Sequence, residues 1–116
     1  MKIPENGQLI RIFIGESDQW HGKPLYEAII LKARERGIAG ATMLRGLMGF
    51  GAASRIHTAK ILRLSEDLPI VVEIVDGEEK IAAFLPFVQE MVRDGLITLE
   101  KVRVLQYRSG PEEKDM

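Results

Sequence analysis

Four segments of the chain have the apolar pattern of β-strands. Residues 8–15, QLIRIFIG, alternate in the manner of a strand, with Ile10, Ile12 and Ile14 on one face and Leu9, Arg11 and Phe13 on the other. A period of two is typical of a half-buried strand. Residues 69–75, PIVVEIV, form a short apolar run that begins at a proline, and residues 40–48 and 96–107 are also predicted to be extended.

Two segments between these strands have helical spacing instead. Pro24 suits a first helical turn, and the apolar residues that follow it predict a helix over 24–36. Asp76, followed three residues later by Glu79, resembles a capping box and predicts the start of a second helix. Pro86 lies inside that helix and predicts a kink. The apolar stripe of the second helix consists of Ile81, Phe84, Leu85, Val88, Met91 and Val92.

The predicted order of elements is βαββαβ. This is the ferredoxin-like pattern of the α+β class, in which two helices cover one face of a four-stranded antiparallel sheet. The length of 116 residues suits one domain, so residues 1–116 are predicted to form a single unit. Its core is expected over about 8–108, followed by a charged, flexible tail at 109–116.

The face of the sheet away from the helices is predicted to be largely apolar. Its predicted members are Leu9, Arg11, Phe13, Val71, Glu73, Val75, Lys101, Arg103 and Leu105. A monomer rarely exposes a contiguous apolar surface of this kind, so we expect self-association through this face, with Arg11 and Glu73 close enough to pair. The alternative is an amphipathic sheet that is partly solvated.

Charge and composition exclude several classes of function. Sixteen Lys and Arg residues against seventeen Asp and Glu residues give a net charge of -1, which removes a general attraction to nucleic acid, and no nucleic-acid partner is expected. The absence of cysteine excludes disulfides and thiolate chemistry. Because the N-terminal sequence has neither a signal peptide nor a membrane-spanning run, a cytoplasmic location is the default expectation.

Residues 45–60, RGLMGFGAASRIHTAK, combine glycines with basic and polar side chains. Glycine lets backbone N–H groups approach an anion, and basic side chains neutralise phosphate oxygens. A small anionic ligand is therefore the predicted occupant, and no metal is expected among these residues. The candidate ligand-binding residues are Arg45, Gly49, Phe50, Gly51, Arg55, His57 and Lys60.

The same segment lacks both common nucleotide fingerprints. Gly46 and Gly51 have the spacing of a P-loop, but Ala52 and Ala53 follow where a P-loop has Lys and then Ser or Thr. The dinucleotide fingerprint that Gly49 and Gly51 would begin has no third glycine. A mobile connection between two strands remains the alternative interpretation, although a loop of this length is often functional.

Two histidines allow a different hypothesis, that of a small hydrolytic or metal-assisted enzyme. His57 could act as a base near neutral pH. Glu16, Asp18 and His21 offer carboxylate and imidazole ligands for a divalent ion. Ordinary turn chemistry explains the same three residues, with Trp20 packed over the start of the first helix. No known catalytic motif accompanies them, so no catalytic residue is predicted.

Several strings of the sequence resemble a known family. GESDQWHGKPLYEAI, GIAGATMLRGLMGFG, SRIHTAKILRLSEDLPIVVEIVD and LITLEKVRVLQY look like an uncharacterised PII-like family of bacteria and archaea, related in fold to the PII nitrogen-signalling proteins. The resemblance runs from about residue 8 to 108. It implies a PII-like signalling or regulatory protein that is not an enzyme.

The resemblance also implies an assembly and a mode of action. PII proteins are trimers that bind effectors, typically adenine nucleotides, in clefts between subunits and present a loop to a partner such as a membrane transporter or an enzyme. By position, that loop corresponds to about 49–60, and the turn at Arg93–Gly95 lies where PII proteins have a second phosphate-contacting loop. The chain lacks the T-G-x-x-G-D-G-K type loop and the modified tyrosine of true PII proteins, so sensing of ATP and 2-oxoglutarate does not follow.

Overall fold

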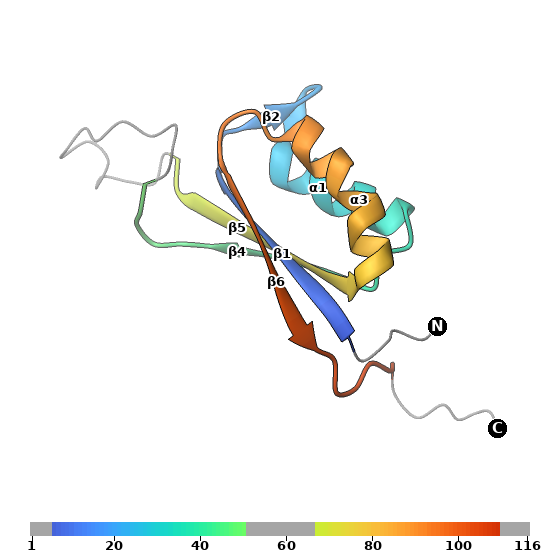
Figure 1. Ribbon diagram of the computed structural model, residues 1–116. Coiled ribbons are helices and arrows are strands. Elements are labelled where there is room, and N and C mark those ends of the chain that lie inside the picture. The colour runs from blue at the N-terminus through green and yellow to red at the C-terminus, as the bar shows by residue number, and fades with distance from the viewer. Residues whose placement is uncertain (1–5, 51–66, 110–116) are drawn as a thin grey trace.

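The computed structural model describes residues 6–50 and 67–109. Four strands form one antiparallel sheet in the order β4-β5-β1-β6, and helices α1 and α3 cover one of its faces (Figure 1). The strands are β1 (Asn6–Gly15), β4 (Gly40–Arg45), β5 (Pro69–Gly77) and β6 (Leu96–Arg103); the helices are α1 (Leu25–Glu35) and α3 (Glu78–Met91). The predicted ferredoxin-like α+β fold is confirmed.

The alternation in the two central strands places the core. β1 and β5 pair so that Ile10, Ile12 and Ile14 lie opposite Ile74, Val72 and Ile70, and all six side chains are buried. The helices close this layer with Leu25, Ala28, Ile29, Ala33, Ile81, Phe84, Val88 and Met91. Among the described residues, fourteen buried apolar side chains form one cluster, and their burial is the main stabilising contribution to this part of the chain.

Strand ends and helix starts differ from the predictions by a few residues. β4 ends at Arg45 rather than residue 48, and β6 ends at Arg103 rather than residue 107. The capping prediction for Asp76 is wrong, because Asp76 belongs to β5 and α3 begins at Glu78 after Gly77, without a side-chain cap. The described helix continues through Pro86 to Met91.

A short hairpin that the sequence pattern did not predict follows β1. It consists of β2 (Gln19–Trp20) and β3 (Lys23–Pro24). The two turn residues, His21 and Gly22, both have positive φ values, 48° and 83°. This is the backbone of a two-residue type I′ turn, in which glycine is favoured at the second position. Of the three residues assigned to ordinary turn chemistry, His21 therefore belongs to a defined hairpin, whereas Glu16 and Asp18 precede it.

The face of the sheet opposite the helices, the open face, is crossed by a charged row. The Arg11 guanidinium on β1 lies 3.0 Å from a Glu73 carboxylate oxygen on β5 and 3.1 Å from a Glu100 oxygen on β6. The expected pairing of Arg11 with Glu73 is confirmed. The hydrogen bond to Glu73 is the main cause that raises the pKa of Arg11, and Glu100 adds to it.

The prediction for Lys101 and Arg103 on the open face is wrong. In the register, Lys101 pairs with Gln8 and Arg103 with Asn6, whose positions have the parity of the helix-covered face. Glu100, one residue earlier, is the member of β6 that reaches the open face and Arg11. The prediction failed because β6 has apolar residues at consecutive positions, so its alternation does not define a face. Leu105 lies beyond the end of β6 and is exposed.

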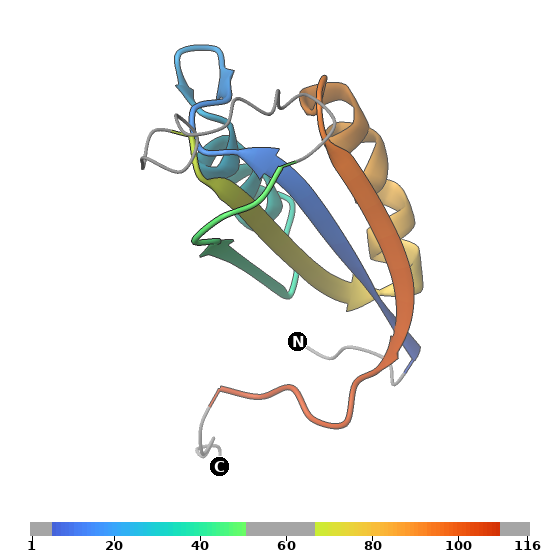
Figure 2. The same ribbon diagram turned by 90° about the vertical axis from the view of Figure 1, so that its left-hand side faces the viewer.

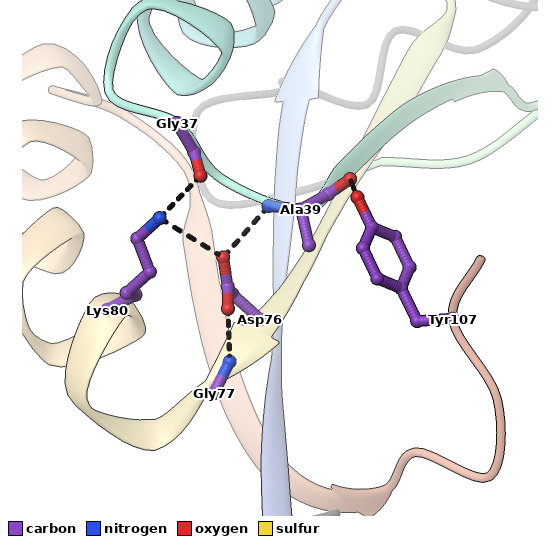
Figure 3. A network of polar contacts seen from close by, with 6 residues as sticks. All are labelled: Gly37, Ala39, Asp76, Gly77, Lys80 and Tyr107. Carbon is purple, nitrogen blue, oxygen red and sulfur yellow. Dashed lines mark hydrogen bonds and ion pairs between the residues drawn. The ribbon is translucent and has the colours of Figure 1, made fainter. Parts of the chain in front are cut away.

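A buried carboxylate, that of Asp76, stabilises the end of the sheet where α3 starts. We call this end of the sheet the Asp76 end. Asp76 is 3% exposed and accepts backbone hydrogen bonds from Ala39 (2.8 Å) and Gly77 (2.6 Å). Lys80 donates to the Gly37 carbonyl at 2.6 Å and lies 3.9 Å from Asp76. These contacts join the α1–β4 turn to α3 (Figure 3).

The chain after β6 returns to this network. It crosses the end of the sheet towards β4 (Figure 2). There the Tyr107 hydroxyl donates to the Ala39 carbonyl at 3.0 Å.

Candidate functional site

The opposite end of the sheet gathers the connections that the sequence marked as functional; we call it the loop end. Arg45, the last residue of β4, pairs with Ile70 near the start of β5, and β1 finishes beside them. Leu96, the first residue of β6, pairs with β1 at the same end. Residues 16–18 and 46–50 and the α3–β6 turn therefore all leave the sheet in one region (Figure 1).

Arg45 is held at the loop end by an ion pair. Its Nη2 atom donates to a carboxylate oxygen of Glu16 at 2.7 Å, and the Glu16 backbone N–H donates to the Leu68 carbonyl at 2.9 Å. The Arg45 side chain is 52% exposed and that of Glu16 is 26% exposed. Because exposed ion pairs contribute at most about 1 kcal/mol, an anion from solution can compete with Glu16 for this guanidinium.

A second contact holds the chain where it returns to the sheet. Asp67 Oδ1 accepts hydrogen bonds from both the backbone N–H and the hydroxyl of Ser17, each at 2.9 Å. Glu16 and Ser17 are neighbours, so two consecutive residues after β1 contact the chain on both sides of the segment 46–66. The sequence reasoning missed Ser17 and Asp67, since a serine and an aspartate 50 positions apart form no local motif.

Residues 46–50 run close to the start of β5. The Gly46 N–H donates to the Pro69 carbonyl at 2.8 Å, and a Cβ atom at position 46 would lie 3.0 Å from Pro69 Cγ. A larger residue at position 46 would therefore require a small shift of Pro69 or of the chain beside it. Beyond it, the apolar side chains of Leu47, Met48 and Phe50 are 92%, 65% and 73% exposed. This segment thus presents apolar side chains to solvent next to the Arg45 guanidinium.

Three of the seven predicted ligand-binding residues fall within the described part of the chain. Arg45, Gly49 and Phe50 lie together at the exit of β4. The remaining four lie outside the described residues: Gly51, Arg55, His57 and Lys60. The structure therefore brings the basic end of the predicted site next to Glu16, a residue that the sequence assigned to a different hypothesis.

The structure does not assemble Glu16, Asp18 and His21 into a metal site. Glu16 pairs with Arg45, one Asp18 oxygen accepts the Gly15 N–H at 3.0 Å, and the His21 ring stacks on Trp20. Within residues 6–50 and 67–109, no group of three His, Cys, Asp or Glu side chains could hold a metal ion. His57, the other residue of the enzyme hypothesis, lies outside the described residues.

A cavity of about 400 Å³ opens beside the β2–β3 hairpin. It lies between the hairpin, the start of α1 and the α3–β6 turn. Its lining consists of Asp18, Gln19, Trp20, His21, Leu25, Met91, Arg93 and Asp94. The indole and imidazole rings of Trp20 and His21 are stacked, with centroids 4.3 Å apart and planes at 8°. As predicted, Trp20 packs partly buried against the core near the start of α1.

None of the helices in the described part of the chain is long and apolar enough to cross a membrane. Relatives of the chain are found among bacterial and archaeal proteins of the same size. A UPF0166 protein of Aquifex aeolicus (strain VF5) is 44% identical over 98 residues, which cover 84% of this chain and 92% of the relative. A UPF0166 protein of Methanocaldococcus jannaschii is 34% identical over 98 residues, which cover 84% of this chain and 90% of the relative.

The fold is similar to that of a solved PII-like protein. CPII from Thiomonas intermedia K12, a nitrogen regulatory PII-like protein, superposes with a TM-score of 0.64 at 16% sequence identity; 87% of this chain and 90% of CPII are covered. That structure of CPII contains ADP, AMP and bicarbonate, and another contains ADP, AMP and acetate. The family model described as DUF190, Uncharacterized ACR, matches residues 7–104. The chain therefore belongs to the DUF190 family and has a PII-like fold.

Proposed function

We propose that the chain is a PII-like regulatory protein that binds a small anionic effector, such as an adenine nucleotide, at the loop end of its sheet. Binding there changes how residues 49–60 are presented to a partner protein such as a transporter or an enzyme. The effector binds in a cleft between neighbouring subunits of a trimer. The other candidate residues come from the same segment: Gly49, Phe50, Gly51, Arg55, His57 and Lys60.

One observation carries this proposal, the pair of contacts that hold the chain before and after the segment 46–66. Arg45 lies on one side and Asp67 on the other, and both contact the consecutive residues Glu16 and Ser17. An anion that takes the Arg45 guanidinium from Glu16 acts at the base of the loop. A ligand shifts a loop between two states only through its different affinity for them, and this contact provides such a difference.

Two further facts support the nature of the effector and the assembly. The PII-like protein CPII, of similar fold, contains ADP and AMP in its solved structure. The open face of the sheet carries apolar residues on both sides of its charged row, and Leu44 and Leu96 on this face are 50% and 53% exposed. Self-association would cover this apolar surface.

Isothermal titration of the full chain with ADP, AMP and ATP, each with and without bicarbonate, tests the proposal. We expect one nucleotide to bind, and Arg45→Gln to weaken that binding by about tenfold, because a charge-assisted hydrogen bond to phosphate is lost. Arg34→Gln is the matched control, since Arg34 is exposed on α1, away from the loop end. Its affinity should equal that of the unmodified chain.

Sedimentation velocity on the same samples measures the number of subunits. A trimer with Arg45-dependent nucleotide binding is the expected result. A monomer would contradict the proposed cleft between subunits. A trimer that binds none of these anions would contradict the proposed effector. Equal loss of affinity in the Arg45 and Arg34 variants would show that the effect is one of net charge alone.

A further inference from the structure

The cavity beside the β2–β3 hairpin is a second place where the structure has the features of a ligand site. Its volume of about 400 Å³ lies within the range of small-molecule pockets. It is formed by segments far apart in the sequence, the hairpin after β1 and the turn after α3. It is also separate from Arg45, which is not among its lining residues.

The inner surface of the cavity includes apolar side chains. Leu25 and Met91, which are 3% and 6% exposed, come from the start of α1 and the end of α3. The stacked rings of Trp20 and His21 add a flat wall. His21 adopts a positive φ of 48°, an uncommon conformation for a residue other than glycine, and its imidazole stacks on the indole. An aliphatic or aromatic group of a ligand would be well accommodated against these four side chains.

The rim of the cavity carries charges of both signs. Arg93 and Asp94 are exposed and, among the described residues, make no ion pair or side-chain hydrogen bond. Asp18 uses one carboxylate oxygen to accept the Gly15 N–H, which leaves its second oxygen available to a ligand. The rim thus offers one guanidinium donor and two carboxylate acceptors beside an apolar floor.

The balance of these charges selects the class of ligand. Two carboxylates and one guanidinium would repel a phosphate group, which carries up to two negative charges near neutral pH. This charge balance argues against the phosphate contact that the resemblance to PII proteins implies for the turn at Arg93–Gly95. A molecule with one carboxylate and one ammonium group satisfies the rim without adding net charge, and its apolar part would occupy the floor. We propose that this cavity binds an apolar α-amino acid. Arg93 binds the ligand carboxylate, and Asp94 and Asp18 accept hydrogen bonds from its ammonium group.

Intrinsic fluorescence gives a direct test because Trp20 is the single tryptophan of the chain. The full chain is titrated with L-leucine and L-methionine, and in parallel with N-acetyl-L-leucine and L-leucine amide, which lack the ammonium and the carboxylate charge respectively. We expect a saturable change in Trp20 emission with the free amino acids, at a dissociation constant of about 0.1 to 1 mM. The two blocked compounds should bind at least about tenfold more weakly.

Variants then assign the charged contacts. Arg93→Gln and Asp94→Asn should each weaken L-leucine binding by about tenfold, while Arg34→Gln should leave it unchanged. Arg45→Gln, which removes the guanidinium proposed to bind nucleotide, should also leave it unchanged. These variants therefore test the proposed amino acid site and the proposed effector site independently.

Three results would overturn the proposal. The first is the absence of any saturable emission change with amino acids up to about 20 mM. The second is equally tight binding of the N-acetyl compound, which would mean that the carboxylates do not contact the ligand. The third is an emission change caused by AMP or ADP that depends on Arg93, which would assign the cavity to the nucleotide instead.

Discussion

The two ends of the sheet use charged side chains in opposite ways. At the Asp76 end, a carboxylate that is 3% exposed accepts two backbone hydrogen bonds and lies near Lys80. At the loop end, Glu16 and Arg45 form a pair that solvent reaches from outside. Both ends join segments that are far apart in the sequence. Only the Asp76 end does so through a carboxylate that is buried from water.

This difference separates a structural contact from a contact that can change partners. If a buried carboxylate and its hydrogen-bond donors are separated, the group that remains is buried and unsatisfied. This lowers the free energy of unfolding by several kcal/mol. An exposed ion pair that opens is compensated by water and costs less than about 1 kcal/mol. The Asp76 end is therefore suited to hold the fold together, whereas the loop end is suited to respond to a ligand.

The largest expected effect comes from Asp76→Ala. Two backbone N–H groups, those of Ala39 and Gly77, lose their acceptor at a buried position. We expect the free energy of unfolding to fall by about 3 kcal/mol, as measured by urea denaturation. Glu79→Ala, an exposed change in the first turn of the same helix, is the control and should cost no more than about 1 kcal/mol. Equal losses in the two variants would mean that Asp76 has no special structural role.

The position of Asp76 also shows where sequence reasoning reached its limit. The spacing of Asp76 and Glu79 matches a capping box, but that motif needs the aspartate directly before the first helical residue, and Gly77 holds that position. Here β5 continues through Asp76, and its carboxylate turns to the Ala39 N–H on a separate segment. The strands β1 and β5 were predictable because β1 repeats isoleucine at every second position and β5 is a short apolar run that begins at a proline. A contact between residues 37 positions apart leaves no such periodic signal.

A smaller effect is expected from Lys80→Met, which tests whether the network acts as a unit. Lys80 donates to the Gly37 carbonyl, but its side chain is 45% exposed. Its removal should lower the free energy of unfolding by about 1 kcal/mol. In a double-mutant cycle with Asp76→Ala, we expect a coupling free energy of at least about 0.5 kcal/mol. Strict additivity would show that Lys80 and Asp76 stabilise the turn independently.

Some residues of the loop end were predictable from the sequence because their residue types suit anion binding. Glycines and basic residues in one short stretch marked Arg45, Gly49 and Phe50, because anion binding depends on local composition. The contacts that position them, Glu16 with Arg45 and Ser17 with Asp67, join three segments through the fold. The sequence suggested a metal ligand for Glu16, since a carboxylate carries no indication of its partner. Only the folded structure shows that this partner is the Arg45 guanidinium.

The smallest effect on stability, and the sharpest test of the comparison, is expected from Glu16→Gln. The exposed pair with Arg45 is weakened, so the free energy of unfolding should change by less than about 0.5 kcal/mol. The guanidinium is then no longer neutralised by a carboxylate, and nucleotide affinity measured by calorimetry should rise several-fold. Glu27→Gln, an exposed substitution on α1, removes the same charge elsewhere and serves as the control. If Glu16→Gln instead weakens nucleotide binding as Arg45→Gln does, then Glu16 orients the guanidinium for the ligand rather than competing with it.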